Sequence, residues 1–465
     1  MNQTTGIILA AGKGTRMNSS KAKVLHALAG KTMVKHVLDA VSLAGVTRQI
    51  VVIGHQGEDV KRALGQEYIY ALQEEQLGTG HAVMQTREFW DNKFGTLLVL
   101  CGDTPLITSE TVEKLIKEHR DNNAVCSVLT AQVPRPKGYG RIIRDNRGHV
   151  IAIIEEKDAT EEQQKIEEIN TGCYCFNQEY LKDALAQLNP ANAQGEYYLT
   201  DVISYYQQQD LPVMGVTLKD YRELQGINNR LQLAEAEQLL RHRINNDLML
   251  KGVTMVSPQN TFIDTNVKIG SDTVILPNTY LKGDITIGSN CEIGPETSIS
   301  DSDVGDDVVI NNSVVKESTI GNNCLIGPFS YLRPGTKLAD NVKIGDFVEI
   351  KKSDIGPGSK IPHLTYVGDT QIGKKVNVGA GTITCNYDGK DKWRTILRDG
   401  CFIGSNTNLV APVIVGENAI IGAGSTITKD VPAESLAVAR GKQKNISGWA
   451  TKNNEETKKD KKKEE

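Results

Sequence analysis

Residues 268–299 read KIGSDTVILPNTYLKGDITIGSNCEIGPETSI, and in this stretch an Ile or Leu returns every six residues. Neither an α-helix, with 3.6 residues per turn, nor an alternating strand produces a period of six. A coil with three short faces does produce it, because each face supplies one inward aliphatic side chain before the chain turns. Gly often follows the aliphatic residue, which suits a tight turn. The stretch therefore predicts a β-helix of hexapeptide repeats.

The same period runs through much of the C-terminal half in three frames. Successive coils would bury each other's aliphatic column, so we expect a solenoid. Between Val378 and Ile403 the frame slips, and TCNYDGKDKWRTILRDG intervenes. Such a loop can reach a neighbouring chain or cover a ligand, with a neutral surface insertion as the alternative. The three series are Ile269, Ile275, Leu281, Ile287, Ile293 and Ile299; Ile320, Ile326, Leu332, Leu338, Ile344 and Ile350; and Ile403, Leu409, Val415, Ile421 and Ile427.

The N-terminal half follows a different pattern, in which apolar runs alternate with stretches of helical periodicity. The alternation predicts βαβ units in a Rossmann-like α/β domain, with a mostly parallel sheet covered on both faces. Ligands bind such sheets beyond the carboxyl ends of the strands. The apolar runs are GIILAA, QIVVIG, TLLVLCGD, AVCSVLTA and HVIAIIEE, and the helical stretches include TVEKLIKEHRDN and QEYLKDALAQL.

A single helical stripe connects the two halves. Leu233, Ala236, Leu240, Ile244 and Leu248 are three or four residues apart. Asn228 or Asn229 can cap the start of this helix, and Gly252 its end. We therefore divide the chain into an α/β domain at residues 1–229, a linker helix at 230–250, a β-helix domain at 251–450 and a charged tail at 451–465, which we expect to be disordered.

Composition limits the class of function. The formal net charge of −4 gives no basic surface field, so no nucleic-acid partner is implied. No apolar run approaches the ~18 residues of a membrane span, and the first residues do not resemble a signal peptide. The eight cysteines contain no C-x-x-C pair, which argues against a zinc site and suits reduced thiols. We expect a cytoplasmic protein that acts on small molecules, in which Cys173 and Cys175 point to the same face of a strand.

Two sequence features of the α/β half suggest a phosphate site. In LAAGKGTRM, residues 9–17, Gly12 and Gly14 let backbone amides approach phosphate oxygens, and Arg16 adds a bidentate cation. The P-loop spacing is absent, and Met17 stands where a dinucleotide fingerprint has its third Gly. Asp103, directly after an apolar strand, is a hard oxygen donor that suits Mg²⁺, although a turn cap is the alternative for a lone Asp.

His363, in KIPHLTYVGD, is the corresponding candidate of the β-helix. An acetyl transfer from a thioester to an amine requires deprotonation of the ammonium before attack. An imidazole with an ordinary pKa near 6.5 is suited to take that proton at neutral pH. A structural histidine is the alternative.

The motifs of both halves together resemble one family, the bacterial bifunctional N-acetylglucosamine-1-phosphate uridylyltransferase/glucosamine-1-phosphate N-acetyltransferases. The resemblance runs from about Gly6 to Trp449 and departs at Ala22, where relatives often have Pro before Lys23. It implies a left-handed β-helix and a homotrimer that shares its acetyltransfer site between neighbouring chains. The motifs are LAAGKGTRM, KVLH, LQEEQLGTGHA, LCGDTP, GYGRI, IIEEKDA, EINTG, NAQGEYYLTD, GINNR, YLRPG, EIKKSD and KIPHLTYVGD.

The resemblance implies two reactions. Glucosamine-1-phosphate is acetylated from acetyl-CoA in the C-terminal half, and its product then attacks the α-phosphate of UTP in the N-terminal half, giving UDP-N-acetylglucosamine for peptidoglycan and releasing pyrophosphate. Mg²⁺, with Mn²⁺ as the alternative, would neutralise phosphate charge together with Arg16 and Lys23. Two other readings stay open: a single-activity nucleotidyltransferase with a regulatory β-helix, and a non-catalytic scaffold built from the same folds.

The resemblance also implies roles residue by residue. In the N-terminal half it assigns Leu9, Ala10, Ala11, Gly12, Lys23, Cys101, Gly102 and Asp103 to the nucleotide, Gln73, Gly78 and Thr79 to the uracil side, Gly140, Glu155 and Asn170 to the amino sugar, and Asp103 and Asn228 to the metal. In the C-terminal half it assigns His363 as general base, Arg333, Lys351, Tyr366 and Asn377 to the sugar phosphate, and Ala380, Asn386, Tyr387, Ser405, Ala423 and Arg440 to acetyl-CoA.

Overall fold

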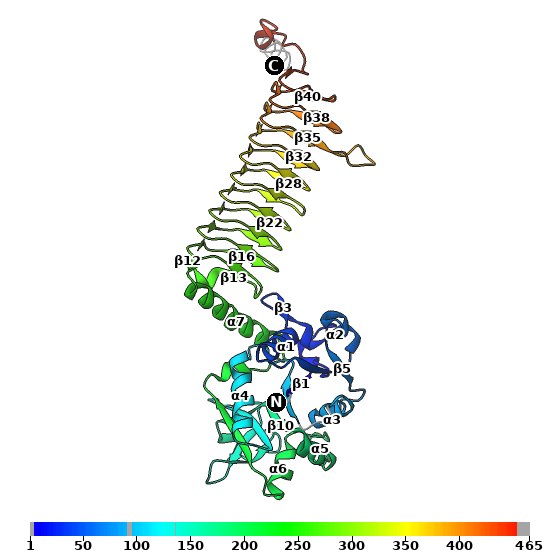
Figure 1. Cartoon of the computed structure of the whole chain (residues 1–465), viewed down its shortest axis with the longest axis vertical. Helices are drawn as coiled ribbons and strands as arrows, with labels where there is room; N and C mark the ends of the chain where they lie inside the picture. Colours follow the sequence, from blue (N-terminus) through cyan, green and yellow to red (C-terminus); the bar gives the residue numbers. More distant parts are fainter. Residues whose placement is uncertain (1–3, 91–94, 135, 453–465) are drawn as a thin grey trace, which may run out of the picture. The chain divides into compact units, whose positions relative to one another are not determined.

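The computed structural model describes residues 4–90, 95–134 and 136–452, which form two compact units (Figure 1). One unit is Met1–Asn246 with Ile263–Thr265, and the other is Asp247–Phe262 with Asn266–Glu465. Among the described residues, none of the helices combines the length and apolar character that crossing a bilayer requires. From residue 453 onward, the tail for which we expect disorder lies outside the described residues.

The first unit is built on a nine-stranded sheet whose main order is β11-β7-β10-β6-β1-β4-β5, with β8 and β9 attached through β10. β1 pairs in parallel with β4 and β6, whereas β10 runs antiparallel to β6 and β7, so the sheet is mostly parallel, as predicted. The strands are β1 Thr4–Leu9, β4 Arg48–Ile53, β5 Ile69–Leu72, β6 Thr96–Cys101, β7 Cys126–Gln132, β8 Arg141–Arg144, β9 Val150–Ile154, β10 Glu168–Asn177 and β11 Val213–Leu218, beside a small β2 Ala27–Leu28 and β3 Lys31–Thr32 hairpin.

Helices cover both faces of this sheet. Apolar side chains of α1, α2 and α4 pack with one face, and those of α3, α5 and α6 with the other. Cys173 and Cys175 lie in the same one of these two cores, as the alternation of the strand predicted, and all eight cysteines are free thiols. The helices are α1 Met33–Leu43, α2 Gly57–Leu64, α3 Thr79–Met84, α4 Ser109–Asp121, α5 Gln178–Ala186 and α6 Asp201–Gln208, with short 3₁₀ turns at η1 Thr15–Met17, η2 Lys23–Leu25, η3 Arg87–Phe89, η4 Gln163–Lys165 and η5 Tyr221–Leu224.

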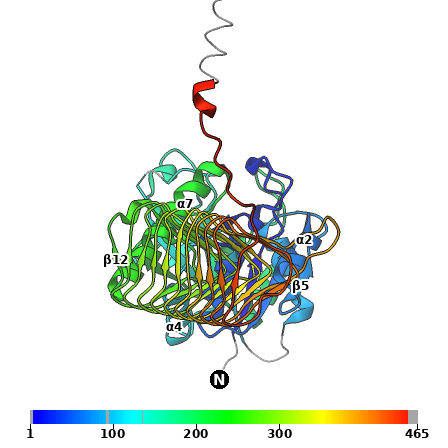
Figure 2. The same cartoon turned by 90° about the horizontal axis from the view of Figure 1, so that it is seen from above.

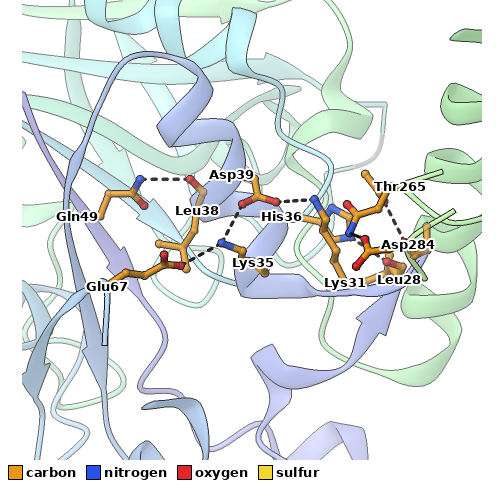
Figure 3. Close-up of polar contacts among 12 residues, drawn as sticks. Leu28, Lys31, Lys35, His36, Leu38, Asp39, Gln49, Glu67, Thr265 and Asp284 are labelled. Atoms are coloured by element: carbon orange, nitrogen blue, oxygen red, sulfur yellow. Dashed lines mark hydrogen bonds and ion pairs between the residues drawn. The ribbon is translucent and has the colours of Figure 1, made fainter. Parts of the chain in front are cut away.

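Polar contacts hold α1 in place (Figure 3). Asp39 accepts a hydrogen bond from Lys31 at 2.8 Å and forms an ion pair with Lys35 at 3.2 Å. Lys35 in turn donates to Glu67 at 3.3 Å. The buried His36 places Nε2 2.8 Å from the carbonyl oxygen of Leu28, and its burial lowers the pKa of the ring. These contacts fix α1 beside the segment that precedes it and beside the start of β5.

The order of the strands places a switch point at β1. The chain moves from β1 to β4 and β5 on one side, then to β6 on the other side of β1. At such a point the loops after two neighbouring parallel strands diverge and leave a crevice at their carboxyl ends. Leu9 and Cys101, the last residues of β1 and β6, are in register, so the predicted phosphate loop and Asp103 both begin at this crevice.

The predicted connecting helix is α7, Arg230–Leu250. Asn229 caps it, because its side chain accepts a hydrogen bond from the amide of Gln232 at 2.9 Å. Gly252 follows its end with a φ of 99°, a conformation that favours glycine. Ala236, Leu240 and Leu248 of the predicted stripe are buried, and Leu233 and Ile244 are partly buried.

The second unit is a three-sided parallel β-helix whose coils stack on one another (Figures 1 and 2). Each strand pairs in parallel with its counterpart one coil further on, for example Leu332 with Ile350. The predicted inward aliphatics are buried, except that Ile269 in the first coil is only half-buried. The structure confirms the predicted fold class of α/β domain, helix and left-handed parallel β-helix.

Each side of the β-helix is one sheet. The first side contains β12 Thr254–Met255, β15 Val274–Ile275, β18 Glu292–Ile293, β21 Val309–Ile310, β24 Leu325–Ile326, β27 Lys343–Asp346, β30 Lys360–His363, β33 Asn377–Val378, β36 Phe402–Ile403, β39 Ile420–Ile421 and β41 Leu436–Ala437. The second contains β13 Thr261–Ile263, β16 Thr279–Lys282, β19 Ser298–Ser300, β22 Val314–Lys316, β25 Tyr331–Leu332, β28 Glu349–Lys351, β31 Tyr366–Gly368, β34 Ile383–Cys385, β37 Asn408–Val410 and β40 Thr426–Ile427. The third contains β14 Lys268–Ile269, β17 Thr286–Ile287, β20 Asp303–Val304, β23 Thr319–Ile320, β26 Lys337–Leu338, β29 Asp354–Ile355, β32 Thr370–Ile372, β35 Thr395–Leu397 and β38 Val413–Val415.

The predicted interruption of the repeat is a loop that leaves the coil between β34 and β35 and projects from the solenoid (Figure 1). Tyr387 and Lys392 form an antiparallel bridge across it. The indole of Trp393 and the backbone amide of Asp391 both donate to the Asp388 carboxylate, at 2.6 and 2.7 Å. The loop is therefore a self-bonded hairpin.

Buried histidines make the first unit sensitive to acid. Burial, with Arg120 nearby, lowers the pKa of His119 to about 4. His119 stays neutral in the folded chain while the unfolded chain takes up a proton below pH 6.5. Its contribution to the free energy of unfolding is therefore complete above pH 6.5 and falls as the pH drops towards 4, by about 2 kcal/mol at pH 5. We expect His119→Gln to reduce the difference between thermal unfolding at pH 7 and at pH 5.

The exposed His55 provides the matched control, and His55→Gln should leave the pH dependence unchanged. If His119→Gln showed the same loss of stability between pH 7 and 5 as the parent chain, His119 would not be its source.

Candidate active sites

A cavity of about 440 Å³ lies at the switch point of the first unit. Ten residues that the sequence predicted for the nucleotide line it, together with five that it did not predict. The predicted ones are Leu9, Ala10, Ala11, Gly12, Lys23, Gln73, Gly78, Thr79, Cys101 and Asp103; the others are Lys13, Val24, Gln76, Ala82 and Glu196.

Close backbone packing sets the shape of this cavity. The amide of Gly102 donates to the carbonyl oxygen of Leu9 at 2.9 Å, which ties the loop after β6 to the end of β1. Gly14 has a φ of 61°, and a Cβ there would lie 2.6 Å from Cβ of Lys23. Only glycine fits both requirements, so Gly14 lets the phosphate loop pass directly over Lys23.

Two cationic side chains of the site contact two side chains that carry oxygen acceptors. The Lys23 ammonium contacts the Asp103 carboxylate and donates to Oδ1 of Asn228 at 3.1 Å. Arg16 donates to the same Oδ1 at 3.0 Å. Lys23 and Asp103 are mostly buried, and Gln232 holds Asn228 by accepting from its amide at 2.8 Å. Asp103 and Asn228, far apart in sequence, therefore point at one positive charge.

The residues predicted for the amino sugar form a separate group, with Gly140 just before β8, Glu155 just after β9 and Asn170 on β10. The amide of Asn170 donates to the carbonyl oxygen of Gly140 at 2.9 Å, and Tyr174 donates to Oδ1 of Asn170 at 2.9 Å. A Cβ on Gly140 would lie 3.3 Å from Oε1 of Glu155. Burial, and then Asp158 and Asp201, raises the pKa of Glu155. None of Gly140, Glu155 and Asn170 is among the residues that line the cavity.

Arg230 is a residue of this site that the sequence did not single out. Its Nε donates to the carbonyl oxygen of Met17 at 3.3 Å, and its Nη1 lies 3.2 Å from Nδ1 of the buried His26. Arg230 therefore joins the start of α7 to the residue after Arg16 and to His26, three residues after Lys23. The motif GINNR ends on this arginine, which was the available signal.

In the second unit, His363 has a partner that the sequence did not single out. Its Nδ1 lies 2.6 Å from Oδ1 of Asp346, and the two residues are in register on β30 and β27. Asp346 stands two residues after Ile344, as His363 stands two residues after Ile361. Stacking the repeats on one another would have revealed the pair.

Cations gather on the neighbouring side of the solenoid. Arg333 follows β25, Lys351 ends β28 and Tyr366 begins β31, and these three strands are neighbours. Arg333 donates to Glu349 at 2.8 Å. Lys392 of the hairpin loop lies beside Lys351 and, more than burial or Arg333, lowers the pKa of Lys351. Lys392 also belongs to this cluster, although the sequence did not predict it.

The residues predicted for acetyl-CoA divide into two groups. Ala380, Ser405 and Ala423 occupy one corner of successive coils, two residues after Val378, Ile403 and Ile421, and Arg440 donates to the carbonyl oxygen of Ala423 at 2.6 Å. Asn386 is buried and donates to Asp369 at 2.6 Å, whereas Tyr387 is exposed on the hairpin loop. Asn377, predicted for the sugar phosphate, lies on β33 in register with Lys360 of β30.

Comparisons with known proteins assign a family to each half of the chain. Residues 5–229 match the nucleotidyl transferase family, and residues 266–301, 317–352 and 394–429 match the bacterial transferase hexapeptide repeat. The chain is 57% identical to the bifunctional protein GlmU of Heliobacterium modesticaldum over 96% of this chain and 97% of that protein. It is 52% identical to the GlmU protein of Carboxydothermus hydrogenoformans, over 95% and 98%, and 48% identical to that of Clostridioides difficile, over 97% and 98%.

The cation cluster of the second unit predicts an anion site. Arg333, Lys351 and Lys392 repel one another, and a phosphate among them would relieve that repulsion. At ten times its dissociation constant, inorganic phosphate should stabilise the chain by about 1.4 kcal/mol. Thermal unfolding in phosphate and in chloride of equal ionic strength measures this gain, and Lys392→Met should remove most of it.

Lys337→Met, which removes an exposed lysine from β26 on another side of the solenoid, should keep the full gain. An undiminished gain in Lys392→Met would exclude Lys392 from the anion site.

Proposed function

The chain belongs to the family of bifunctional GlmU proteins, and from this membership we propose an assignment of its two reactions to the two candidate sites. The protein is a bifunctional enzyme: it transfers acetyl from acetyl-CoA to glucosamine-1-phosphate, and uridylyl from UTP to N-acetylglucosamine-1-phosphate, with UDP-N-acetylglucosamine and pyrophosphate as products. Residues 1–229 carry the nucleotidyl transfer and residues 251–450 the acetyl transfer, with the helix 230–250 between them and a charged tail at 451–465.

The convergence of Lys23 and Arg16 on Asp103 and Asn228 carries the assignment of the uridylyl site. A carboxylate and an amide oxygen that approach one ammonium are placed to approach one metal ion. Mg²⁺ needs only one or two such protein ligands besides phosphate and water, so the residues fit Mg²⁺, with Mn²⁺ as the alternative. In the described part of the chain, no group of three or more His, Cys, Asp or Glu side chains forms a further candidate metal site.

The other residues of the cavity bind the nucleotide. Leu9 to Gly12 and Cys101 form the backbone wall beside the phosphates, Gly102 holds that wall through its hydrogen bond to Leu9, and Gln73, Gly78 and Thr79 take the uracil side. Gly140, Glu155 and Asn170 bind the amino sugar; the glycine leaves room for a hydroxyl beside Glu155, and the amide of Asn170 offers a donor and an acceptor. The enzyme positions the sugar phosphate for in-line attack on the α-phosphate of UTP.

The main contribution of this site to uridylyl transfer is neutralisation of negative charge on the phosphates. Negative charge grows on the leaving pyrophosphate as the new bond to the α-phosphate forms. Lys23 and Arg16, released from Asp103 and Asn228, bind phosphate oxygens, and a bound metal ion supplies further charge neutralisation. Arg230 holds the loop that carries both cations.

Asp103→Ala should lower UDP-N-acetylglucosamine formation at least about 100-fold, because it removes the one charged oxygen donor of the proposed metal site. Acetyl transfer by the same protein should stay within twofold of the parent rate. Release of pyrophosphate and of free CoA measures the two reactions separately. Loss of both activities in a folded variant would contradict the two-site assignment.

A metal chelator separates the leading assignment from its alternatives. With EDTA, uridylyl transfer should stop while acetyl transfer continues. A single-activity nucleotidyltransferase with a regulatory β-helix would show only uridylyl transfer, and a scaffold with inactive sites would show neither reaction.

The acetyltransfer site is assigned to His363 and its neighbours. The substrate ammonium gives one proton to His363, and the freed nitrogen pair attacks the thioester carbon. The C–N bond forms and the C–S bond breaks, the departing sulfur takes the proton from the imidazolium, and a second nitrogen proton leaves to water. Tyr366 and Asn377 bind the sugar phosphate with the cations Arg333 and Lys351.

Acetyl-CoA lies along the next coils. Ala380, Ser405 and Ala423 are small residues at one corner of the solenoid, which suits a slot for a slim thioester arm. Arg440 follows them and offers a cation to the CoA phosphates. Asn386 and Tyr387 contribute from the hairpin loop. No acyl-enzyme intermediate is needed for direct transfer to the amine.

His363→Ala should lower the rate of acetyl transfer by about 100-fold or more, the usual contribution of a general base. Uridylyl transfer by the same preparation serves as the control for folding and should not change. A normal acetyl-transfer rate in this variant would remove His363 from the mechanism.

A homotrimer assembled through the β-helix is the proposed quaternary state. Phe329 and Phe347 stack with ring centroids 5.4 Å apart at one corner, and both remain exposed, as does Leu364 in the next coil. These three large residues have φ values of 59°, 58° and 48°, a conformation that costs about 1 kcal/mol per residue. An exposed apolar column held in a strained conformation supports a contact with other copies of this chain, next to His363.

The setting of the two reactions follows from their substrates. UTP and acetyl-CoA are cytoplasmic metabolites, so we assign the enzyme to the cytoplasm, with small molecules and its own copies as partners and no nucleic acid. The product UDP-N-acetylglucosamine would feed peptidoglycan and other cell-envelope precursors.

A further inference from the structure

The corner of the β-helix that carries His363 is one column of equivalent positions. Asp346, His363, Ala380, Ser405 and Ala423 occupy it in five successive coils, each two residues after a buried aliphatic. On one side of His363 the column continues with the small residues of the proposed acetyl-CoA slot. On the other side the next residue of the column is the carboxylate of Asp346, which contacts the ring.

The contact defines which imidazole nitrogen carries a proton. Oδ1 of Asp346 lies 2.6 Å from Nδ1 of His363. The His363 interaction, followed by a local backbone hydrogen bond, lowers the pKa of Asp346, so this carboxylate is ionised at neutral pH. An ionised carboxylate can only accept hydrogen bonds, and Nδ1 must therefore donate. In the neutral ring this leaves the lone pair on Nε2.

We propose that Asp346 is a positioning residue for acetyl transfer, which orients His363 and keeps Nε2 as the nitrogen that takes the substrate proton. The inference rests on the assignment of His363 as general base. Asp346 acts through His363 alone and needs no contact with either substrate. The β-helix makes the arrangement rigid, because Asp346 and His363 are paired on adjacent parallel strands.

The charges around His363 single out Asp346. On β27 and β30 the other charged residues are Lys343 and Lys360, three residues before Asp346 and His363, so they lie at the opposite ends of the two strands. β33, on the far side of β30, carries Asn377 and Val378, which have no charge.

The carboxylate and the cation on the adjoining side have partners of their own. Glu349 of β28 accepts from Arg333 at 2.8 Å, and Lys351 lies beside Lys392. Tyr366 of β31 is a phenol rather than a carboxylate. Asp346 is thus the negative charge that the geometry places against the ring.

Solvent exposure sets the expected size of the effect. The side chains of His363 and Asp346 are 56% and 39% exposed, so water screens their interaction. Screening weakens the charge interaction, but Asp346 still orients the His363 ring and selects its tautomer, because both effects depend on the hydrogen bond to Nδ1. Asp346→Ala, which removes both, should lower kcat for acetyl transfer about tenfold. The KM for glucosamine-1-phosphate should stay within twofold, because Asp346 does not touch the substrate.

Asp346→Asn separates orientation from charge. The asparagine oxygen can still accept from Nδ1, so kcat should fall only about threefold. The negative charge that stabilises the protonated ring is lost, and the acid limb of the kcat/KM profile should therefore move to lower pH. A merely structural role of Asp346 would not move this limb.

The experiment measures kcat, KM and the pH profile of acetyl transfer for the full-length parent, Asp346→Ala, Asp346→Asn and His363→Ala. Asp303→Ala, which removes an exposed carboxylate of β20 elsewhere on the solenoid, is the matched control and should behave like the parent. Uridylyl transfer and thermal unfolding of each variant report folding.

Each outcome decides a different point. A kcat loss in Asp346→Ala together with the shifted acid limb in Asp346→Asn supports the inference. Unchanged kcat and pH profile in both variants overturn it, and so does a raised KM with normal kcat, which would make Asp346 a binding residue. If His363→Ala kept the parent rate, the general-base assignment itself would fail. A severe loss in His363→Ala with parent-like Asp346 variants would overturn only the role of Asp346.

Discussion

The register between successive coils is the constraint on which the second unit depends. Every strand pairs in parallel with its counterpart one coil away, so inward aliphatic side chains stack on one another and outward residues form straight columns. A shift by one residue would turn the aliphatic column outward, so burial holds the register. The same register determines the proposed acetyltransfer corner, because Asp346 lies opposite His363 when Ile344 lies opposite Ile361. One pairing therefore sets both the core packing and the contact at the proposed site of acetyl transfer.

The first unit uses a different constraint, the divergence of loops at a switch point between parallel strands. β1 and β6 end side by side, and the hydrogen bond from Gly102 to Leu9 ties their loops together. Asp103 and Asn228 come from distant parts of the chain, yet both contact the Lys23 ammonium at this edge. Backbone topology places the site, and a few side chains, Arg230 among them, fix its loop.

Elements with strong periodicity could be predicted from the sequence. Contacts that periodicity does not encode were not predicted. The six-residue rhythm predicted the solenoid, and the stripe ending at Leu248 predicted α7 with its cap at Asn229. Ile269 shows the limit, because the rhythm cannot tell a first coil, with fewer neighbours, from an inner one. Ten of the nucleotide residues line one cavity, since motifs at strand ends meet at one edge of a sheet. Arg230 and Lys392 were missed, because their partners are fixed by folding rather than by neighbouring motif residues. Asp346 was missed because the repeats had not been aligned coil by coil.

The column from His363 to Ala423, with Arg440 in the coil after it, has a further consequence. Adjacent parallel strands are about 4.8 Å apart, so each coil added to the column lengthens it by that amount. The residues beyond His363 lie one, two, three and four coils away: Ala380, Ser405, Ala423 and Arg440. Together they span about 19 Å along the axis of the β-helix. A point substitution changes the side chain that one coil presents at this corner. The length of the span changes only by insertion or deletion of a complete coil of about eighteen residues. The length of the proposed acetyl-CoA slot can therefore change only in steps of one coil.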